Sequence, residues 1–95
     1  MNQSMYFRPS GVNEVVAFDA SAAMATAVAA ECFMVEVVAS ENCYISIESA
    51  PTATAVNGMY IVKDWPYFVK ITPGEKIAAI KVTTAGNLYI SQLTQ

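Results

Sequence analysis

The sequence contains no histidine and few charged residues. Among 95 residues there are five Lys and Arg against eight Asp and Glu, so charged residues make up 14% of the chain and the net charge is −3. Without histidine, the most common general base and metal ligand at neutral pH is missing, and two cysteines alone cannot complete a tetrahedral zinc site. We therefore expect no enzyme, no cofactor and no metal centre.

The sequence also argues against two classes of partner, nucleic acids and membranes. The five Lys and Arg are spread over the chain and build no positive stripe of the kind that binds phosphate backbones, so we expect no nucleic-acid partner. The apolar stretch from residue 20 to 30 is too short and too rich in Ala, Ser and Thr to span a bilayer. The first ten residues lack the apolar centre of a secretory signal, so synthesis in the cytoplasm is expected.

Low charge also bears on assembly. A soluble monomer of this size usually presents roughly 25–35% charged residues on its surface, and this chain cannot supply them. The acidic residues occur singly, without the convergence that a calcium loop or a glycosidase pair requires. We therefore expect another chain to cover part of the apolar surface; the alternative is a sparsely charged soluble monomer.

Alternation of apolar and polar residues recurs from residue 33 to the end and indicates half-buried strands. Turn signals separate the apolar runs, among them Asn57-Gly58 and Pro73-Gly74. The side chains expected to face inward are Phe33, Val35 and Val37; Cys43, Ile45 and Ile47; Tyr67, Val69 and Ile71; Ala78, Ile80 and Val82; and Leu88 and Ile90.

The stretch from Val15 to Ala30 is ambiguous, because its alanines favour a helix. It lacks a helical stripe of large apolar residues, so we predict strands at Glu14–Phe18 and Ala22–Val28, with a short helix as the alternative. The prediction is an all-β protein: a single antiparallel β-sandwich, jelly-roll or immunoglobulin-like, with about eight short strands in residues 12–95. Residues 1–11 are predicted to form an extended N-terminal arm.

Both cysteines are predicted to be free thiols. A tight hairpin of Phe33–Ser40 with Asn42–Glu48 would place Cys32 and Cys43 far apart along the ladder. A disulfide needs Cα atoms within about 7 Å, and the cytoplasm keeps thiols reduced.

Alternation also directs several aromatic side chains outward. Tyr44, Phe68 and Tyr89 face away from the predicted core, and Tyr60 and Trp65 lie near the intervening loop. Three uses remain open: packing under loops of the same chain, a subunit interface, and a platform for sugar rings. The arm is either disordered or docked on a partner or neighbouring subunit. The candidate interface residues are Met5, Tyr6, Phe7, Arg8, Tyr44, Tyr60, Trp65, Phe68 and Tyr89.

Several segments from residue 43 onward resemble small virion proteins of tailed bacteriophages. They cover a little over half of the chain: Cys43–Ile47, Pro51–Ala55, Met59–Val62, Tyr67–Ile71, Pro73–Ile80 and Gly86–Ile90. The resemblance implies a compact β-sandwich that assembles on a phage particle, either as a capsid decoration (cement) protein that bridges capsomers or as a neck or tail component.

The resemblance also implies partners and a location. The partners are further copies of the chain, as a trimer, and the major capsid protein or another virion protein. The location is the virion, after synthesis in the host bacterial cytoplasm. The alternative from a different class is a carbohydrate-binding β-sandwich in which Trp65 and Tyr60 stack on sugar rings.

Overall fold

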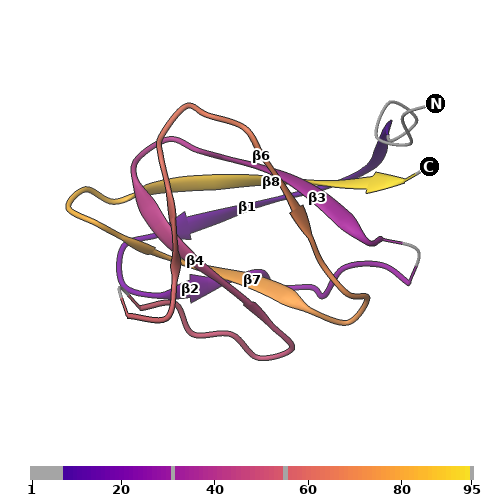
Figure 1. Cartoon of the computed structure of the whole chain (residues 1–95), viewed down its shortest axis with the longest axis horizontal. Coiled ribbons are helices and arrows are strands. Elements are labelled where there is room, and N and C mark those ends of the chain that lie inside the picture. Colours follow the sequence, from indigo (N-terminus) through magenta and orange to yellow (C-terminus); the bar gives the residue numbers. More distant parts are fainter. Residues whose placement is uncertain (1–7, 31, 55, 95) are drawn as a thin grey trace.

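The computed structural model describes residues 8–30, 32–54 and 56–94, and these contain eight β-strands and no helix (Figure 1). The all-β prediction with eight strands is confirmed. The strands are β1 (Arg8–Phe18), β2 (Ala22–Ala23), β3 (Met34–Ala39), β4 (Cys43–Glu48), β5 (Met59–Ile61), β6 (Tyr67–Lys70), β7 (Lys76–Lys81) and β8 (Gly86–Thr94).

The strands form two antiparallel four-stranded sheets that pack face to face. The order is β1-β8-β3-β6 in one, the β1 sheet, and β2-β7-β4-β5 in the other, the β2 sheet. Across the whole chain, β1 pairs with β8, β2 with β7, β3 with β6 and β4 with β5. A long hairpin rolled up so that its strand pairs alternate between two sheets is a jelly roll. Of the two predicted sandwich types, the topology is therefore that of a jelly roll.

The core lies between the two sheets. In β3, Val35, Val37 and Ala39 are fully buried and their neighbours are half-buried, which is the alternation expected of a strand with one face on the core. Phe18, at the end of β1, is among the largest fully buried side chains, at 2% exposure. The predicted strands thus owe their positions to the inward apolar sets.

The predicted hairpin of Phe33–Ser40 with Asn42–Glu48 is wrong. β3 and β4 belong to different sheets, and the residues between them form a corner. There the Ser40 amide donates to the Asn87 carbonyl oxygen at 2.9 Å, and the Ser40 hydroxyl accepts from the Asn87 amide at 2.8 Å. These bonds hold the end of β3 against β8 while the chain turns to the other sheet. Both cysteines are free and buried, as predicted, although not because of that hairpin.

The inward set predicted for β7 is also wrong. Ile77 and Ala79 join the core, whereas Ala78 is buried outside it, opposite Ser46 of β4 and Ala23 of β2. Four consecutive apolar residues, 77–80, fit either face, so alternation could not decide between them. Phe33, predicted to face inward, precedes β3 and is 57% exposed.

The strand predicted for Ala22–Val28 is confined to Ala22–Ala23. Beyond it, the amides of Met24 and Val28 donate to the carbonyl oxygens of Ile77 and Glu75, both at 3.0 Å. The segment therefore follows β7 without continuing the ladder, and the alternative of a helix is excluded by these bonds.

β1 begins four residues before the predicted boundary of the sandwich. Arg8 pairs with Thr94 and Pro9 with Leu93, and the register shifts between Pro9 and Asn13. Gly11 lies at this shift with φ +88°, a backbone conformation that glycine adopts without steric cost. The remainder of the predicted arm, residues 1–7, lies outside the described residues.

Candidate functional site

The outward aromatic residues are divided between the two outer faces of the sandwich. Tyr44 and Tyr60 lie opposite each other on the β2 sheet, with ring centroids 5.5 Å apart and an edge-to-face angle of 69°. Phe68 and Tyr89 lie on the outer face of the β1 sheet, where the neighbouring positions face the core. Trp65, 63% exposed, is in the loop between β5 and β6. These aromatics therefore do not form one cluster: Tyr44 and Tyr60 contact each other, whereas Phe68 and Tyr89 lie on strands that β3 separates.

Four further candidates from the sequence cannot be placed. Met5, Tyr6 and Phe7 lie outside the described residues, and only the backbone of Arg8 is described. Their predicted contacts stay predictions.

The outer face of the β1 sheet carries a contiguous set of apolar side chains. Val15 of β1 lies opposite Tyr89 of β8, which lies opposite Val38 of β3, and Phe68 of β6 is diagonal to Val38. Val15, Tyr89 and Phe68 are 53%, 47% and 63% exposed, and Val38 is half-buried. We call these four residues the outer apolar row.

Few charges accompany the outer apolar row. Glu36 lies opposite Phe68 and Ser91 within the same face, and Lys70 lies at one end of β6. On the solvated face of an antiparallel sheet, these positions usually carry polar residues. Exposed Tyr and Phe with few charges are instead typical of interface centres.

Sequence analysis missed two members of the row, Val15 and Val38. The signal that identifies them is a run of apolar residues without alternation, Val15 to Phe18 and Val37 to Ala39, because such a run leaves both faces of a strand apolar.

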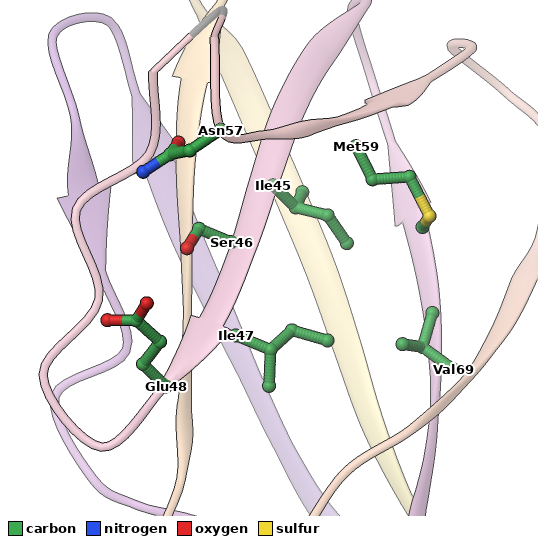
Figure 2. Close-up of a pocket in the computed structure, with 7 residues that line it drawn as sticks. All are labelled: Ile45, Ser46, Ile47, Glu48, Asn57, Met59 and Val69. Atoms are coloured by element: carbon green, nitrogen blue, oxygen red, sulfur yellow. The ribbon is translucent and has the colours of Figure 1, made fainter.

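A second feature is a pocket of about 300 Å³ at the edge of the sandwich, beside Met59, the first residue of β5 (Figure 2). In Figure 2, four apolar side chains, those of Ile45, Ile47, Met59 and Val69, gather on one side of β4, and the polar ones point to the other. We call this the edge pocket. Its lining residues are Ile45, Ser46, Ile47, Glu48, Asn57, Met59 and Val69.

The edge pocket exists because β5 is short. β5 pairs with β4 only at Cys43, Tyr44 and Ile45, whereas β4 pairs with β7 as far as Glu48. Among the described residues, none pairs with the stretch Ser46–Glu48 on the β5 side. The backbone groups that this stretch directs outward are therefore open to a further strand.

The loop before β5 turns away from β4 because its own side chains bond to it. The Asn57 carboxamide oxygen accepts from the Thr54 amide at 2.9 Å, and its nitrogen donates to the Thr52 carbonyl oxygen at 3.2 Å. The Gly58 amide donates to the Thr54 carbonyl oxygen at 2.9 Å. This folded loop ends at Met59, which forms one wall of the edge pocket.

Trp65 belongs to a second crossing between the sheets. The Asp64 amide donates to the Ala39 carbonyl oxygen at 2.8 Å, and the Lys63 amide donates to the Asn42 side-chain oxygen at 2.9 Å. The loop is thus tied to the corner between β3 and β4. Trp65 follows Asp64 in this loop and is exposed.

The described residues contain no group of three His, Cys, Asp or Glu side chains placed to hold a metal ion, and no helix long and apolar enough to cross a membrane. Glu14 is half-buried, and its carboxylate accepts from the Ala25 amide at 2.6 Å. Its carboxylate thereby ties the segment after β2 to β1.

Burial raises the pKa of the Cys43 thiol from 9.0 to about 11. Between pH 9 and pH 11 the Cys43 thiol is ionised in the unfolded chain but still protonated in the folded one, so rising pH favours unfolding. The stability that the protonated thiol contributes is therefore fully present below pH 9 and is lost as the pH rises to 11. The loss amounts to roughly 2–3 kcal/mol. Urea unfolding at pH 8 and pH 11 measures it. Cys43→Ala is the control, because it has no thiol to ionise at this position. An equal pH dependence of the unfolding free energy in both proteins would contradict the prediction.

The comparisons with known proteins assign no family. No family model, no curated protein and no solved structure matches the chain.

Proposed function

We propose that this protein is a non-enzymatic structural protein of a tailed-bacteriophage virion, a decoration protein that stabilises the capsid by bridging capsomers. The observation that carries the proposal is the outer apolar row, a sheet face with exposed Val15, Phe68 and Tyr89. Such a face is suited to burial against protein.

Two observations and one expectation from the sequence support this proposal. Charged residues make up only 14% of the chain, and the expectation is the resemblance to phage virion proteins described for segments between residues 43 and 90. The jelly roll also occurs in viral capsid domains, which is an argument by analogy of fold. The same fold occurs in lectins, so a carbohydrate-binding module with Trp65 is the alternative that the experiment must separate.

The proposed mechanism needs only contact area. Each large apolar side chain moved from water into an interface contributes about 1.5–3 kcal/mol before the costs of association. Many weak contacts repeated around a shell give high avidity. The proposed partners are further copies of the chain, as a trimer, and the major capsid protein; a neck or tail position would use the same surface on another virion protein.

The test compares two exposed phenylalanines. Phe68, in the row, is 63% exposed, and Phe33, outside it, is 57% exposed. We expect Phe68→Ala to weaken capsid binding by roughly tenfold or more, since it removes one buried side chain from the interface. Phe33→Ala should bind as the unmodified protein does. Co-sedimentation with capsids measures binding, and thermal unfolding checks that both variants are folded.

Two outcomes would overturn the proposal. An equal loss of capsid binding for Phe33→Ala and Phe68→Ala would show that the outer apolar row is not the binding surface. A protein that stays monomeric by light scattering, does not bind capsids and is retained by a glycan array would be a carbohydrate-binding module.

A further inference from the structure

The dipeptide Asn57-Gly58 is the place in this chain where an asparagine can react with its own backbone. The chain has five asparagines, and only Asn57 is followed by glycine. The amide nitrogen of the next residue can attack an asparagine carboxamide, and a glycine, lacking Cβ, lets that nitrogen approach closely. Asn57 is exposed and lines the edge pocket just before β5 (Figure 2). Water and hydroxide therefore reach the reacting atoms.

Both reacting groups are held by two threonines of the same loop. The Asn57 carboxamide oxygen accepts from the amide and the hydroxyl of Thr54, each at 2.9 Å, and the carboxamide nitrogen donates to the Thr52 carbonyl oxygen at 3.2 Å. The Asn57 amide donates to the Thr54 hydroxyl at 3.1 Å, and the Gly58 amide donates to the Thr54 carbonyl oxygen at 2.9 Å. The attacking nitrogen is thus bonded to another carbonyl, and the carboxamide cannot turn toward it without losing its own bonds.

We propose that Asn57-Gly58 is a site of spontaneous deamidation, which the folded loop keeps closed and which opening of the loop exposes. In the open loop, the Gly58 amide gives its proton to hydroxide and its nitrogen bonds to Cγ of Asn57. The Cγ–Nδ2 bond breaks, and the carboxamide nitrogen takes up a proton and leaves as ammonia, so that a cyclic succinimide forms. Water then opens this ring. Opening at Cγ gives aspartate, and opening at the main-chain carbonyl gives isoaspartate.

The isoaspartyl product cannot restore the native loop. Its backbone carries one more carbon between residues 57 and 58, and the fold leaves no space for a shift, because a Cβ on Gly58 would already lie 2.6 Å from the Tyr44 Cβ. Met59 follows Gly58 and lies opposite Ile45, so the displacement reaches the pairing of β5 with β4 and one wall of the edge pocket. A single opening of the loop thus becomes a permanent change.

Peptide mass spectrometry of the full-length protein, kept at about pH 8 with and without guanidinium chloride, tests the site. In the denatured chain, Asn57 should deamidate at least about tenfold faster than Asn42 and Asn87, whose next residues carry side chains. In the folded protein, Asn57 should react roughly tenfold to a hundredfold more slowly, since at least two hydrogen bonds must open and each contributes a factor of about two to ten. Equal rates at Asn57 in the two conditions, or no preference for Asn57 in the denatured chain, would overturn the proposal.

A matched pair of threonine variants tests what keeps the loop closed. Thr54→Val removes the hydroxyl that makes two of the bonds, and in the folded protein it should speed deamidation of Asn57 roughly fivefold or more, with the rate in guanidinium chloride unchanged. Thr52→Val is the control, because Thr52 gives Asn57 only its carbonyl oxygen, and it should leave the rate unchanged. Thr54→Ser restores a hydroxyl and should restore the slow rate. An equal rise for Thr52→Val and Thr54→Val, or no rise for Thr54→Val, would overturn closure by these bonds.

The isoaspartyl chain, purified from the denatured sample and refolded, tests the consequence. Hydrogen exchange of the peptide that contains β5 should be roughly tenfold or more faster than in Asn57→Asp, which adds the same charge on a normal backbone. Failure of the isoaspartyl chain to refold, where Asn57→Asp refolds, would be the same effect in a stronger form. Equal exchange in the two proteins would overturn the permanent change. None of these outcomes depends on the proposed virion role.

Discussion

Phe18→Ala is expected to lower the free energy of unfolding by about 3–5 kcal/mol. Phe18 is 2% exposed and lies in the core between the sheets, at the end of β1. Its removal takes away buried apolar area and leaves a cavity. The neighbouring strand β8 cannot move to fill this cavity, because it is paired with β1 on one side and β3 on the other. Urea unfolding followed by far-UV circular dichroism measures the change.

The control for this prediction is the same substitution at an exposed position. Phe68→Ala, at 63% exposure, should change the free energy of unfolding by no more than about 0.5 kcal/mol. The same variant is expected to lose capsid binding. A loss below about 1 kcal/mol for Phe18→Ala would mean that the two sheets are not packed on this side chain.

Gly58→Ala is expected to cost about 3 kcal/mol, at the upper end of the usual range for overpacking. A Cβ atom at Gly58 would lie 2.6 Å from the Thr54 carbonyl oxygen and 2.6 Å from the Tyr44 Cβ. Both atoms are fixed by backbone, one in the loop before β5 and one in β4. The strand pairing of β4 with β5 would therefore have to shift, and we expect chemical unfolding to show the loss.

Gly74→Ala is the comparison for Gly58→Ala, because it tests the cost of an unfavourable backbone conformation without a close contact. Gly74 has φ +93°, but a Cβ there would meet nothing within 4 Å. Only the strain of the left-handed conformation remains, and we expect a cost of about 1–2 kcal/mol. If Gly58→Ala proved no more costly than Gly74→Ala, the tight contact with Tyr44 and Thr54 would not exist in solution.

Alternation was sufficient to locate most strands but not to assign them to sheets. The inward residues of β3, Val35 and Val37, and of β8, Leu88 and Ile90, were read correctly because each alternates with less buried neighbours. The corner at Ser40–Asn42 was taken for a hairpin turn, since a short polar connection has the same composition whether the next strand pairs or changes sheets. Strand order depends on pairings between distant residues, such as Arg8 with Thr94, which no local pattern contains.

The candidate site was predictable only in part. The alternation correctly predicts that Tyr44, Phe68 and Tyr89 face outward. It does not predict that Tyr44 lies on a different sheet from the other two. The sequence does not predict the edge pocket, because the pocket depends on β5 beginning only at Met59, opposite Ile45, while β4 continues to Glu48. That difference in strand length accompanies the local bonds of Asn57 to Thr52 and Thr54 and the close approach of Gly58 to Tyr44, and the latter is a tertiary feature.

The position of β8 has a consequence for synthesis on the ribosome. β8 is the partner of both β1 and β3, and it is the last strand of the fold to emerge. A nascent chain halted before Gly86 therefore leaves facing edges of β1 and β3 bare, and bare edges promote aggregation. Translation at several residues per second gives these edges seconds of exposure before β8 is available. The β1 sheet, including the outer apolar row, can thus be completed only after translation of β8.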